Sequence, residues 1–345
     1  MTAFHSAAGA PIIDGAAVVE RVRAEFGVGV RSLDQVLGGQ DSDAVVCLAT
    51  TEDGANWAVK VSRGTRAHGL LVCAALTGLG RPGIPAPLQT PDGAPYTLYQ
   101  GRILSVTQWI DGSAAYETGL AADRWREFGG LLSRVHEAPL PSTTRDQLPV
   151  ERYRTPAVAV ARVIDQRIHA AETRSRTDFG DTAKGALIRE WCAARDSISM
   201  ILGHVEELGD ELRAAPADHV VTHGDAHIGN LLLDQDGEMW LLDWDEVALA
   251  PRERDLMFLM GGVLSDAPVT PEQQNWFFQG YGPAEIDQRR LAYYQCSWAV
   301  QDLADFAARV LAQPDQSAAS EQALRFIRGV LSPTGIVQLA RSSLQ

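Results

Sequence analysis

The chain has 345 residues, 46% of them hydrophobic, which is enough for a well-packed core and long enough for two domains or lobes. It has no uncharged apolar run of about 18 residues and no basic start followed by an apolar stretch, so neither a membrane span nor a signal peptide is expected. The formal charge of −14, nearly all of it after residue 108, argues against nucleic acid and anionic membranes as partners; it suits a cationic small molecule and, equally well, plain solubility.

Residues 1–108 have the pattern of a small antiparallel sheet. Two apolar runs, 44–49 and 57–61, flank a Glu-Asp-Gly turn signal and predict a β-hairpin. We expect helices over 14–26 and 66–79, and further strands over 96–100 and 102–110. The sequence therefore predicts a strand-rich N-terminal lobe that ends at residue 108.

Residues 109–345 have a mainly helical pattern. The segment 121–138 carries Trp125, Phe128, Leu131, Leu132 and Val135 on one helical face. Further helices are predicted at 155–172, at 182–213 with Gly203 as a place where the helix could break, and at 253–262, 271–280, 288–312 and 319–330. The fold class expected is therefore α+β, with a small antiparallel-sheet N-lobe and a large, mainly helical C-lobe.

Cysteine and lysine are both used sparingly. The four cysteines lie far apart and form no Cys-x-x-Cys, which predicts free thiols in a reducing cytoplasm. The chain has two lysines, Lys60 and Lys184, and otherwise uses arginine for its positive charge. Lys60 stands in the predicted strand 57–61, on the face opposite Val59 and Val61, so it could face a cleft beneath the sheet.

Residues 223–245 read "HGDAHIGNLLLDQDGEMWLLDWD" and gather polar side chains around two short apolar runs. "NLLL" and "EMWLL" predict the strands of a hairpin, with "DQDG" as its turn. Because a hairpin returns its second strand to the start of its first, we expect Asp243 near Asn230 and near the loop that holds Asp225. Two carboxylates and an amide at one place suit Mg²⁺, which takes a few protein oxygens together with substrate phosphates.

These residues are the parts that a phosphoryl-transfer site needs: a carboxylate for the proton of the attacking hydroxyl, an Asn and an Asp for the metal, and a lysine for the phosphates. Lys60 could be that lysine. The glycines of "LGGQDS", residues 37–42, would let backbone N–H groups approach phosphate oxygens.

Each part also has a structural interpretation. "LGG" is often an ordinary turn, Lys60 could be a surface strand residue, and Asp234 and Asp236 are turn formers. His223 and His227 have the spacing of zinc ligands on a helix, but the neighbouring glycines disfavour a helix and no third His or Cys is near. We expect Asp255 to cap or pin a helix.

"HGDAHIGN" and "LLDWD" resemble the catalytic and metal-binding motifs of aminoglycoside phosphotransferases and related small-molecule kinases. "APRERDLMFLMGG", "FFQGYG" and "LAYYQ" are most similar to the spectinomycin phosphotransferase branch of that family. The resemblance covers residues 30–312 and implies a two-lobed, protein-kinase-like fold.

The resemblance also implies a role for each matching residue. Asp225 matches the catalytic base, Asn230 and Asp243 match the Mg²⁺ ligands, and Lys60 matches the lysine on the α- and β-phosphates. Gly39 to Ser42 match the turn that covers the phosphates, Gln108 to Ile110 match the hinge that pairs with the nucleotide base, and His227 matches a residue that shapes the catalytic loop.

The sequence departs from the family pattern in two places. Kinase-like lobes usually pair the strand lysine with a glutamate on the following helix, but residues 66–79 contain no acid, so Lys60 must be positioned otherwise. After "LAYY" the branch pattern has an acid–arginine pair and a further acid, where this chain has Ser297, Trp298 and Gln301. An indole there suits a flatter or less charged ligand than a polyamine.

The sequence thus predicts a Mg²⁺-dependent O-phosphotransferase that uses ATP or GTP and acts on a hydroxyl of a small, polar, cationic natural product, with spectinomycin-like aminocyclitols first. The residues expected to line the acceptor site are Asp245, Glu246, Tyr293, Trp298, Asp302 and Asp305. Two alternatives remain: a kinase of another hydroxylated metabolite or antibiotic (a nucleoside, peptide, sugar or amino alcohol), and a nucleotide-binding module without transfer activity.

Overall fold

The computed structural model describes residues 3–5, 11–36, 44–64, 67–175, 180, 182–314 and 317–344. They form two compact units. The first unit comprises Met1–Pro149 and His223–Ala248, and the second comprises Val150–Thr222 and Leu249–Gln345. The predicted lobe boundary at residue 108 is a different division of the chain and stays a prediction. The stretch 223–245 belongs to the same unit as Lys60.

The first unit is built on an antiparallel sheet of five strands in the order β3-β4-β5-β7-β6. Buried side chains alternate along β4, as expected for a sheet with one face on a core. The core holds Val45, Cys47, Val59, Val61, Leu104 and Val106. The strands are β3 (Val30–Gln35), β4 (Ala44–Thr51), β5 (Asn56–Ser62), β6 (Thr97–Tyr99) and β7 (Arg102–Gln108).

One helix closes the core of this sheet. Helix α1 (Gly15–Phe26) begins where the side chain of Asp14 accepts the N–H of Ala16 at 3.0 Å, and it ends at Gly27, which has a φ of 69°. Its buried Val18 and Val22 join the sheet core. Before α1, the short strands β1 (Ala3–His5) and β2 (Pro11–Asp14) pair with each other.

The rest of the first unit surrounds the stretch 223–245. Strands β10 (Leu231–Asp234) and β11 (Met239–Leu241) form the predicted hairpin, and β8 (Gly112–Ala114) adds a third strand, in the order β11-β10-β8. The remaining elements are α2 (His68–Gly78), α3 (Ala115–Thr118), α4 (Ala122–His136), α5 (Ser142–Arg145) and the 3-10 turn η1 (Ile228–Asn230). The face of α4 predicted to be apolar is buried.

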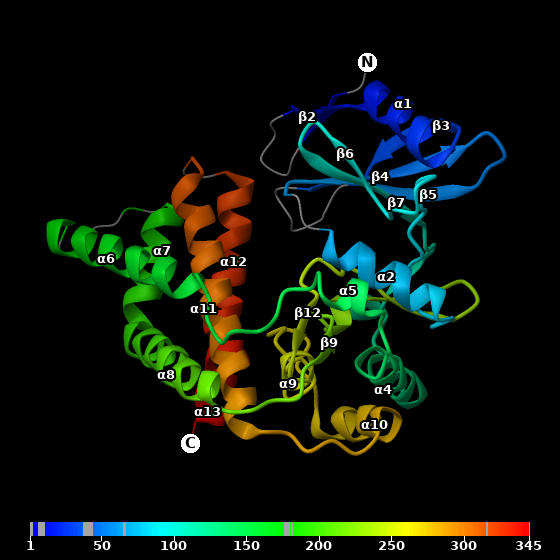
Figure 1. Cartoon of the computed structure of the whole chain (residues 1–345). Coiled ribbons are helices and arrows are strands. Elements are labelled where there is room, and N and C mark those ends of the chain that lie inside the picture. The colour runs from blue at the N-terminus through cyan, green and yellow to red at the C-terminus, as the bar shows by residue number, and fades with distance from the viewer. Residues whose placement is uncertain are drawn as a thin grey trace. The chain divides into compact units, whose positions relative to one another are not determined.

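The second unit is mainly helical and is organised around α11 (Gln288–Ala312), which packs against α6, α8, α12 and α13. Figure 1 shows α11 and α12 lying side by side. The other elements are α6 (Ala157–Ser175), α7 (Ala183–Ala193), α8 (Arg195–Ala214), β9 (Val220–Thr222), α9 (Glu253–Leu256), α10 (Pro271–Tyr281), α12 (Ala318–Leu331) and α13 (Ile336–Ser343). Strand β12 (Ala248–Ala250), which pairs with β9, begins at the last residue of the first unit.

Two predicted helices differ from the observed ones. The helix over 182–213 breaks at Ala194, not at Gly203, which lies inside α8; the turn lets Trp191 of α7 and Ile198 of α8 both be buried. The helix over 253–262 is only the single turn of α9. Gly261 and Gly262 have φ values of 99° and 79°, which no α-helix contains.

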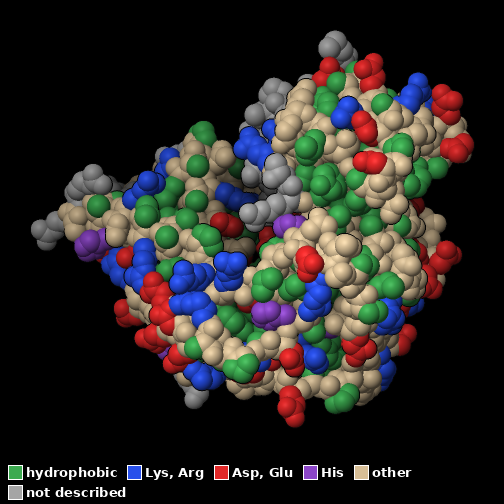
Figure 2. All heavy atoms as spheres, in the orientation of Figure 1, with side chains coloured by type: hydrophobic (Ala, Val, Ile, Leu, Met, Phe, Trp, Pro, Cys, Tyr) green, Lys and Arg blue, Asp and Glu red, His purple; other side chains and the backbone are tan. Residues whose placement is uncertain are grey.

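Charged side chains of both signs are interspersed over the visible face of the helical unit (Figure 2). In this unit Arg195 pairs with Glu172 at 2.9 Å and Arg328 pairs with Glu190 at 3.0 Å. The four cysteines are free, as predicted. Among the described residues, no helix combines the length and the apolar composition that crossing a bilayer requires.

Gly83 holds the end of β11 in place. Its carbonyl accepts the N–H of Leu241 at 2.9 Å, its φ is 79°, and a Cβ atom there would lie 2.2 Å from Leu131 Cδ1 and 2.6 Å from the carbonyl oxygen of Met239. Gly93 has a similar φ of 86° with nothing within 4 Å of such an atom.

We expect Gly83→Ala to lower the free energy of unfolding by about 3 kcal/mol or more, because the strain of the left-handed backbone adds to the overlap. Gly93→Ala, the matched control, should cost only about 1 kcal/mol for the backbone strain. Urea unfolding of both variants measures the two losses, and equal losses would contradict the close contact at Gly83.

Candidate functional site

The β10–β11 hairpin brings the two ends of the polar stretch together. Leu231 pairs with Leu241 in the ladder, and beyond it the N–H of Leu242 donates to the carbonyl of Asn230 at 2.8 Å. Asp243 is the next residue along the chain. The proximity of positions 230 and 243 that the hairpin pattern predicts is therefore present in the structure.

His223 ties the start of the stretch to its end. The ring is completely buried; Nε2 lies 2.9 Å from the carbonyl oxygen of Leu242, and Nδ1 accepts the N–H of Asp225 at 3.2 Å. Since a carbonyl can only accept, this network assigns the proton to Nε2. The indole of Trp244 packs edge-on against the ring, with the two centroids 4.6 Å apart. The sequence showed no role for His223 beyond a rejected zinc site.

Asp225 accepts hydrogen bonds both through its backbone carbonyl and through its carboxylate. The amide Nδ2 of Asn230 donates both to the backbone carbonyl of Asp225 at 2.8 Å and to its carboxylate Oδ2 at 2.7 Å. Nε2 of His227 is 3.2 Å from the other oxygen, Oδ1. Oδ1 is buried and, apart from the His227 ring, has no hydrogen-bond partner within the described part of the chain, so it is the oxygen with a lone pair left for a ligand hydroxyl.

The surroundings keep this carboxylate ionised. Burial raises the pKa of Asp225, but the hydrogen bond and electrostatic effect of His227, the electrostatic effect of His223 and the hydrogen bond from Asn230 together outweigh it, so the pKa lies below its usual value. A carboxylate of this kind can accept a proton from a hydroxyl at neutral pH.

Lys60 lies in the middle of the five-stranded sheet, with Val46 of β4 and Ser105 of β7 as its neighbours in the ladder. Because side chains alternate along β5, the burial of Val59 and Val61 in the core sends Lys60 to the other face. There Nζ lies 2.6 Å from Asp245 Oδ2 and 3.7 Å from Asp243 Oδ1. The face predicted for Lys60 is confirmed, whereas its pairing with Asp245 was not foreseen.

Asp243 has a left-handed backbone, with a φ of 60°, which is uncommon outside glycine and is tolerated best by Asn and Asp. Removal of water from around the carboxylate raises the pKa of Asp243, Lys60 lowers it, and the negative charges of Asp245 and Asp225 raise it again, leaving it above its usual value. Carboxylates that repel one another in this way provide a place for a cation.

The donor set fits a hard divalent ion held partly by other oxygens. Asn230 uses Nδ2 towards Asp225, which leaves its amide oxygen, like the carboxylate of Asp243, as a donor suited to such an ion. Within the described residues, no group of three or more His, Cys, Asp and Glu side chains is arranged to enclose a metal. Two protein ligands completed by phosphate oxygens and water is the arrangement that Mg²⁺ commonly adopts.

The predicted nucleotide-binding residues are only partly described. Gly39 and Ser42 lie outside the described residues. Gln108 ends β7, and its N–H donates to the carbonyl of Ala86 at 3.0 Å, so a base at this hinge would need the groups that follow it, up to Ile110. The roles of all four residues stay predictions.

The predicted acceptor residues divide between the two units. Asp245 and Glu246 are exposed in the first unit, where Asp245 pairs with Lys60. On α11 of the second unit, Tyr293 is 2% exposed and packs edge-on against Tyr153, which favours a packing role. Trp298 packs edge-on against Phe258; Asp302 is half-buried and Asp305 is exposed. Their part in acceptor binding stays a prediction.

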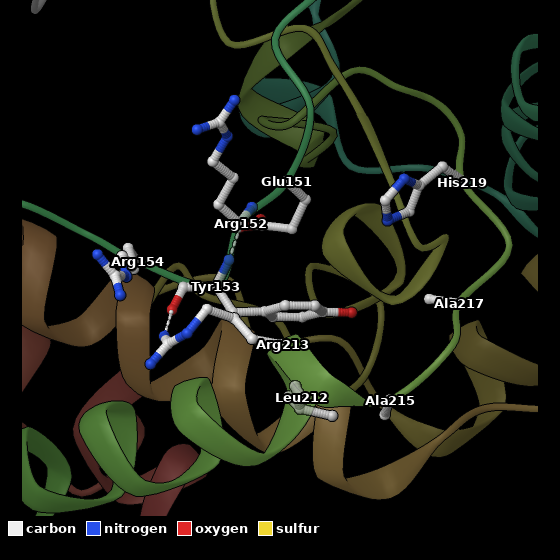
Figure 3. Close-up of a pocket in the computed structure, with 9 residues that line it drawn as sticks. All are labelled: Glu151, Arg152, Tyr153, Arg154, Leu212, Arg213, Ala215, Ala217 and His219. Atoms are coloured by element: carbon white, nitrogen blue, oxygen red, sulfur yellow. Dashed lines mark hydrogen bonds between the residues drawn. The ribbon is translucent and has the colours of Figure 1, made fainter.

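The second unit contains a cavity of about 520 Å³ that sequence reasoning missed (Figure 3). Tyr153, with an unusual φ of 49°, forms part of its wall. Oε1 of Glu151 accepts the backbone N–H groups of Arg152 and Tyr153, at 2.7 and 2.5 Å. The basic side chains that line the cavity are Arg152, Arg154, Arg213 and His219. The lining therefore combines these basic side chains with the acidic Glu151, and Arg213 is already paired with Asp210.

The lowered pKa of Asp225 makes stability depend on pH. The folded pKa lies below the unfolded value of about 3.9, so the stabilisation is fully present above that pH and is lost as the pH falls through the folded pKa. The Asp225→Asn variant has no carboxylate at this position, so it has no such pH-dependent stabilisation to lose. In metal-free buffer, the difference in unfolding free energy between the parent and Asp225→Asn should therefore shrink below about pH 4. Urea unfolding between neutral and acid pH measures it, and a difference that grows towards acid would contradict the shift.

Comparison with known proteins gives this geometry a context. The sequence profile of the "Phosphotransferase enzyme family" matches residues 33–294. No protein with a curated description matches the sequence.

Solved structures show the same fold. Spectinomycin phosphotransferase APH(9)-Ia, solved with ADP and spectinomycin, aligns with a TM-score of 0.82 and 22% identity over 96% of this chain and 99% of that one. The amicoumacin kinase hAmiN, solved with AMP-PNP, Ca²⁺ and its antibiotic, aligns at 0.63 and 16% identity over 94% and 95% of the two chains. An aminoglycoside phosphotransferase from Alicyclobacillus acidocaldarius aligns at 0.58 and 16% identity, with 96% of each chain covered.

These comparisons confirm the predicted fold class, a mixed helix and sheet fold with an antiparallel N-terminal sheet, as in the kinase-like phosphotransferases. Since the family profile covers most of the sequence, including Lys60 and the whole stretch 223–245, the chain belongs to the phosphotransferase enzyme family.

Proposed function

We propose that this protein is a Mg²⁺-dependent O-phosphotransferase that moves the γ-phosphoryl group of ATP or GTP to a hydroxyl of a small, polar natural product. The observation that carries the proposal is the convergence of an ionised Asp225, Asn230, Asp243 and Lys60 within one unit of the fold. A nucleotide-binding module would need the lysine and the metal ligands but not a base.

In this reaction the acceptor oxygen attacks the γ-phosphorus while the bond from phosphorus to the bridging β–γ oxygen breaks. The proton of the acceptor hydroxyl goes to Oδ1 of Asp225, and Asn230 holds the other carboxylate oxygen so that Oδ1 keeps its direction. Mg²⁺, held by Asn230 and Asp243, would supply positive charge to the phosphate oxygens. The Lys60 ammonium offsets charge on the same phosphates.

The acceptor that we propose first is an aminocyclitol or aminoglycoside antibiotic of the spectinomycin type. The similarity of fold to APH(9)-Ia over nearly the whole of both chains supports this choice. The acidic side chain of Glu246 is exposed and follows the metal ligand Asp243 by three residues in the chain, so a cationic acceptor would meet favourable charge there.

A kinase of another hydroxylated antibiotic or metabolite is the second candidate. The observation that favours it is Trp298, whose indole stands on α11 where the branch pattern has a charged residue, and which packs against Phe258 with the centroids 4.9 Å apart. An aromatic wall of this kind suits an acceptor with a flat or apolar part. The fold similarity to the amicoumacin kinase is compatible with such an acceptor.

The base is tested by Asp225→Asn. We expect kcat to fall by about 10²–10⁴-fold, because the amide cannot take the proton, while nucleotide affinity stays within a few-fold of the parent. The measurement is nucleoside diphosphate release with Mg²⁺, in the presence and absence of a panel that includes spectinomycin, other aminoglycosides, nucleoside antibiotics and sugars.

Asp236→Asn, in the exposed turn between β10 and β11, is the matched control and should behave as the parent does. Turnover of Asp225→Asn within about tenfold of the parent would reject the base. Nucleotide binding without turnover on any acceptor would favour a binding module.

The metal ligand is tested by Asp243→Ala. In calorimetric titrations, Mg²⁺ should tighten nucleotide binding to the parent and to Asp236→Ala, but not to Asp243→Ala, because the variant has lost the only carboxylate assigned to the metal. An unchanged effect of Mg²⁺ on the variant would show that the cation is held elsewhere.

A further inference from the structure

The strand lysine has no acid available on the helix that follows it. Residues 61–91 contain neither Asp nor Glu, and α2 reads "HGLLVCAALTG". Yet Nζ of Lys60 is already engaged in the described structure, at 2.6 Å from Asp245 Oδ2, a residue 185 positions later in the chain. The longer distance to Asp243, 3.7 Å, makes Asp245 the closer of the two acids.

Helix α2 is shaped to let the segment 243–245 come this close. A Cβ atom at Gly69, in the first turn of the helix, would lie 2.2 Å from the carbonyl oxygen of Trp244, 2.8 Å from its carbonyl carbon and 3.0 Å from its Cβ. Helix backbone and Trp244 backbone are therefore in direct contact, a contact that only glycine permits.

Other contacts place and hold this segment. The indole N–H of Trp244 donates to the carbonyl of Leu241 at 2.8 Å, and the ring is 5% exposed. Because Trp244 contacts α2 at Gly69, the adjacent Asp245 lies close to this helix, and one turn further along it burial and the negative charge of Asp245 raise the pKa of the Cys73 thiol. Asp245 thus approaches Lys60 from beside α2.

We propose that Asp245 positions Lys60 for the nucleotide phosphates, in the place of a glutamate on α2, and that Gly69 serves this arrangement by making room for the segment 243–245. The inference rests on the proposed function only for the identity of the phosphates; the ion pair itself is a property of the protein alone. Asp243 is left for the metal, so in "DWD" the first acid binds the cation and the second pairs with the lysine.

This pair acts on geometry more than on stability. The side chains of Lys60 and Asp245 are 26% and 56% exposed, and ion pairs with that access to water contribute little to folding. Replacing Asp245 should therefore leave the protein folded, so that a change in the reactivity of the Lys60 amine is not confused with unfolding.

The pairing can be measured directly, because the acylation rates of the chain's two lysines can be compared in one reaction. A limiting amount of an amine-acylating reagent, followed by peptide mass spectrometry, gives the rate at Lys60 relative to the rate at Lys184. An amine released from its ion pair reacts faster, so Asp245→Asn should raise this ratio about two- to fivefold. Asp245→Glu, which keeps the carboxylate, should stay closer to the parent than Asp245→Asn does.

Gly69→Ala tests the role of the helix without touching either charge. The added methyl must push the segment 243–245 away, so the ratio should rise as it does in Asp245→Asn. Gly78→Ala, in the same helix with nothing within 4 Å of its Cβ position, is the matched control and should leave the ratio unchanged. An unchanged ratio in Asp245→Asn, or equal ratios in Gly69→Ala and Gly78→Ala, would overturn the proposal.

Kinetics then connect the pair to the reaction. Asp245→Asn should raise the nucleotide KM more than it lowers kcat, since the lysine is misplaced but the base is intact, and Asp245→Glu should recover part of the loss. A raised requirement for Mg²⁺ with an unchanged acylation ratio would instead make Asp245 a metal ligand and reject the positioning role. If no acceptor is turned over, the proposed function fails, but the acylation ratio still decides the inference.

Discussion

The site depends on the contacts that close the stretch 223–245 on itself, above all the one between the buried ring of His223 and the carbonyl of Leu242. That hydrogen bond joins the loop before β10 to the chain after β11, and the Leu242 N–H to Asn230 carbonyl bond joins the two strand ends at the same point. Because Asp225 and Asp243 each stand within two residues of these bonds, their separation is set by backbone geometry and not by flexible side chains. A buried imidazole that both donates and accepts is well suited to this task.

Electrostatics explain why such a rigid frame is needed. Lys60 lies near the carboxylates of Asp243 and Asp245, and burial together with the negative charges of Asp245 and Asp225 raises the pKa of Asp243 in spite of the lysine. A flexible loop would relieve that repulsion by moving apart. Held in place, the carboxylates keep a repulsion that a nearby cation would relieve.

Much of this could be predicted from sequence because it is local. The β10–β11 hairpin, the side of β5 that carries Lys60 and the long helix α11 follow from side-chain periodicity and turn residues. The missed features are long-range. The Lys60–Asp245 pair spans 185 residues, and the contact between Gly69 and Trp244 depends on how a helix packs, which a glycine in a helix does not reveal by itself. The break at Ala194 was missed for a similar reason: burial of Trp191 and Ile198 outweighed the local preference expressed at Gly203.

The bare contact at Gly69 has a mechanical consequence. Two backbones that touch with no side chain between them have no compressible layer, so a displacement of one is transmitted to the other almost undiminished. Helix α2 and the "DWD" turn should then behave as one solid piece. A ligand that displaces Lys60 would therefore also displace Asp245 and α2, and Asp243 would move with them even if the ligand does not contact it.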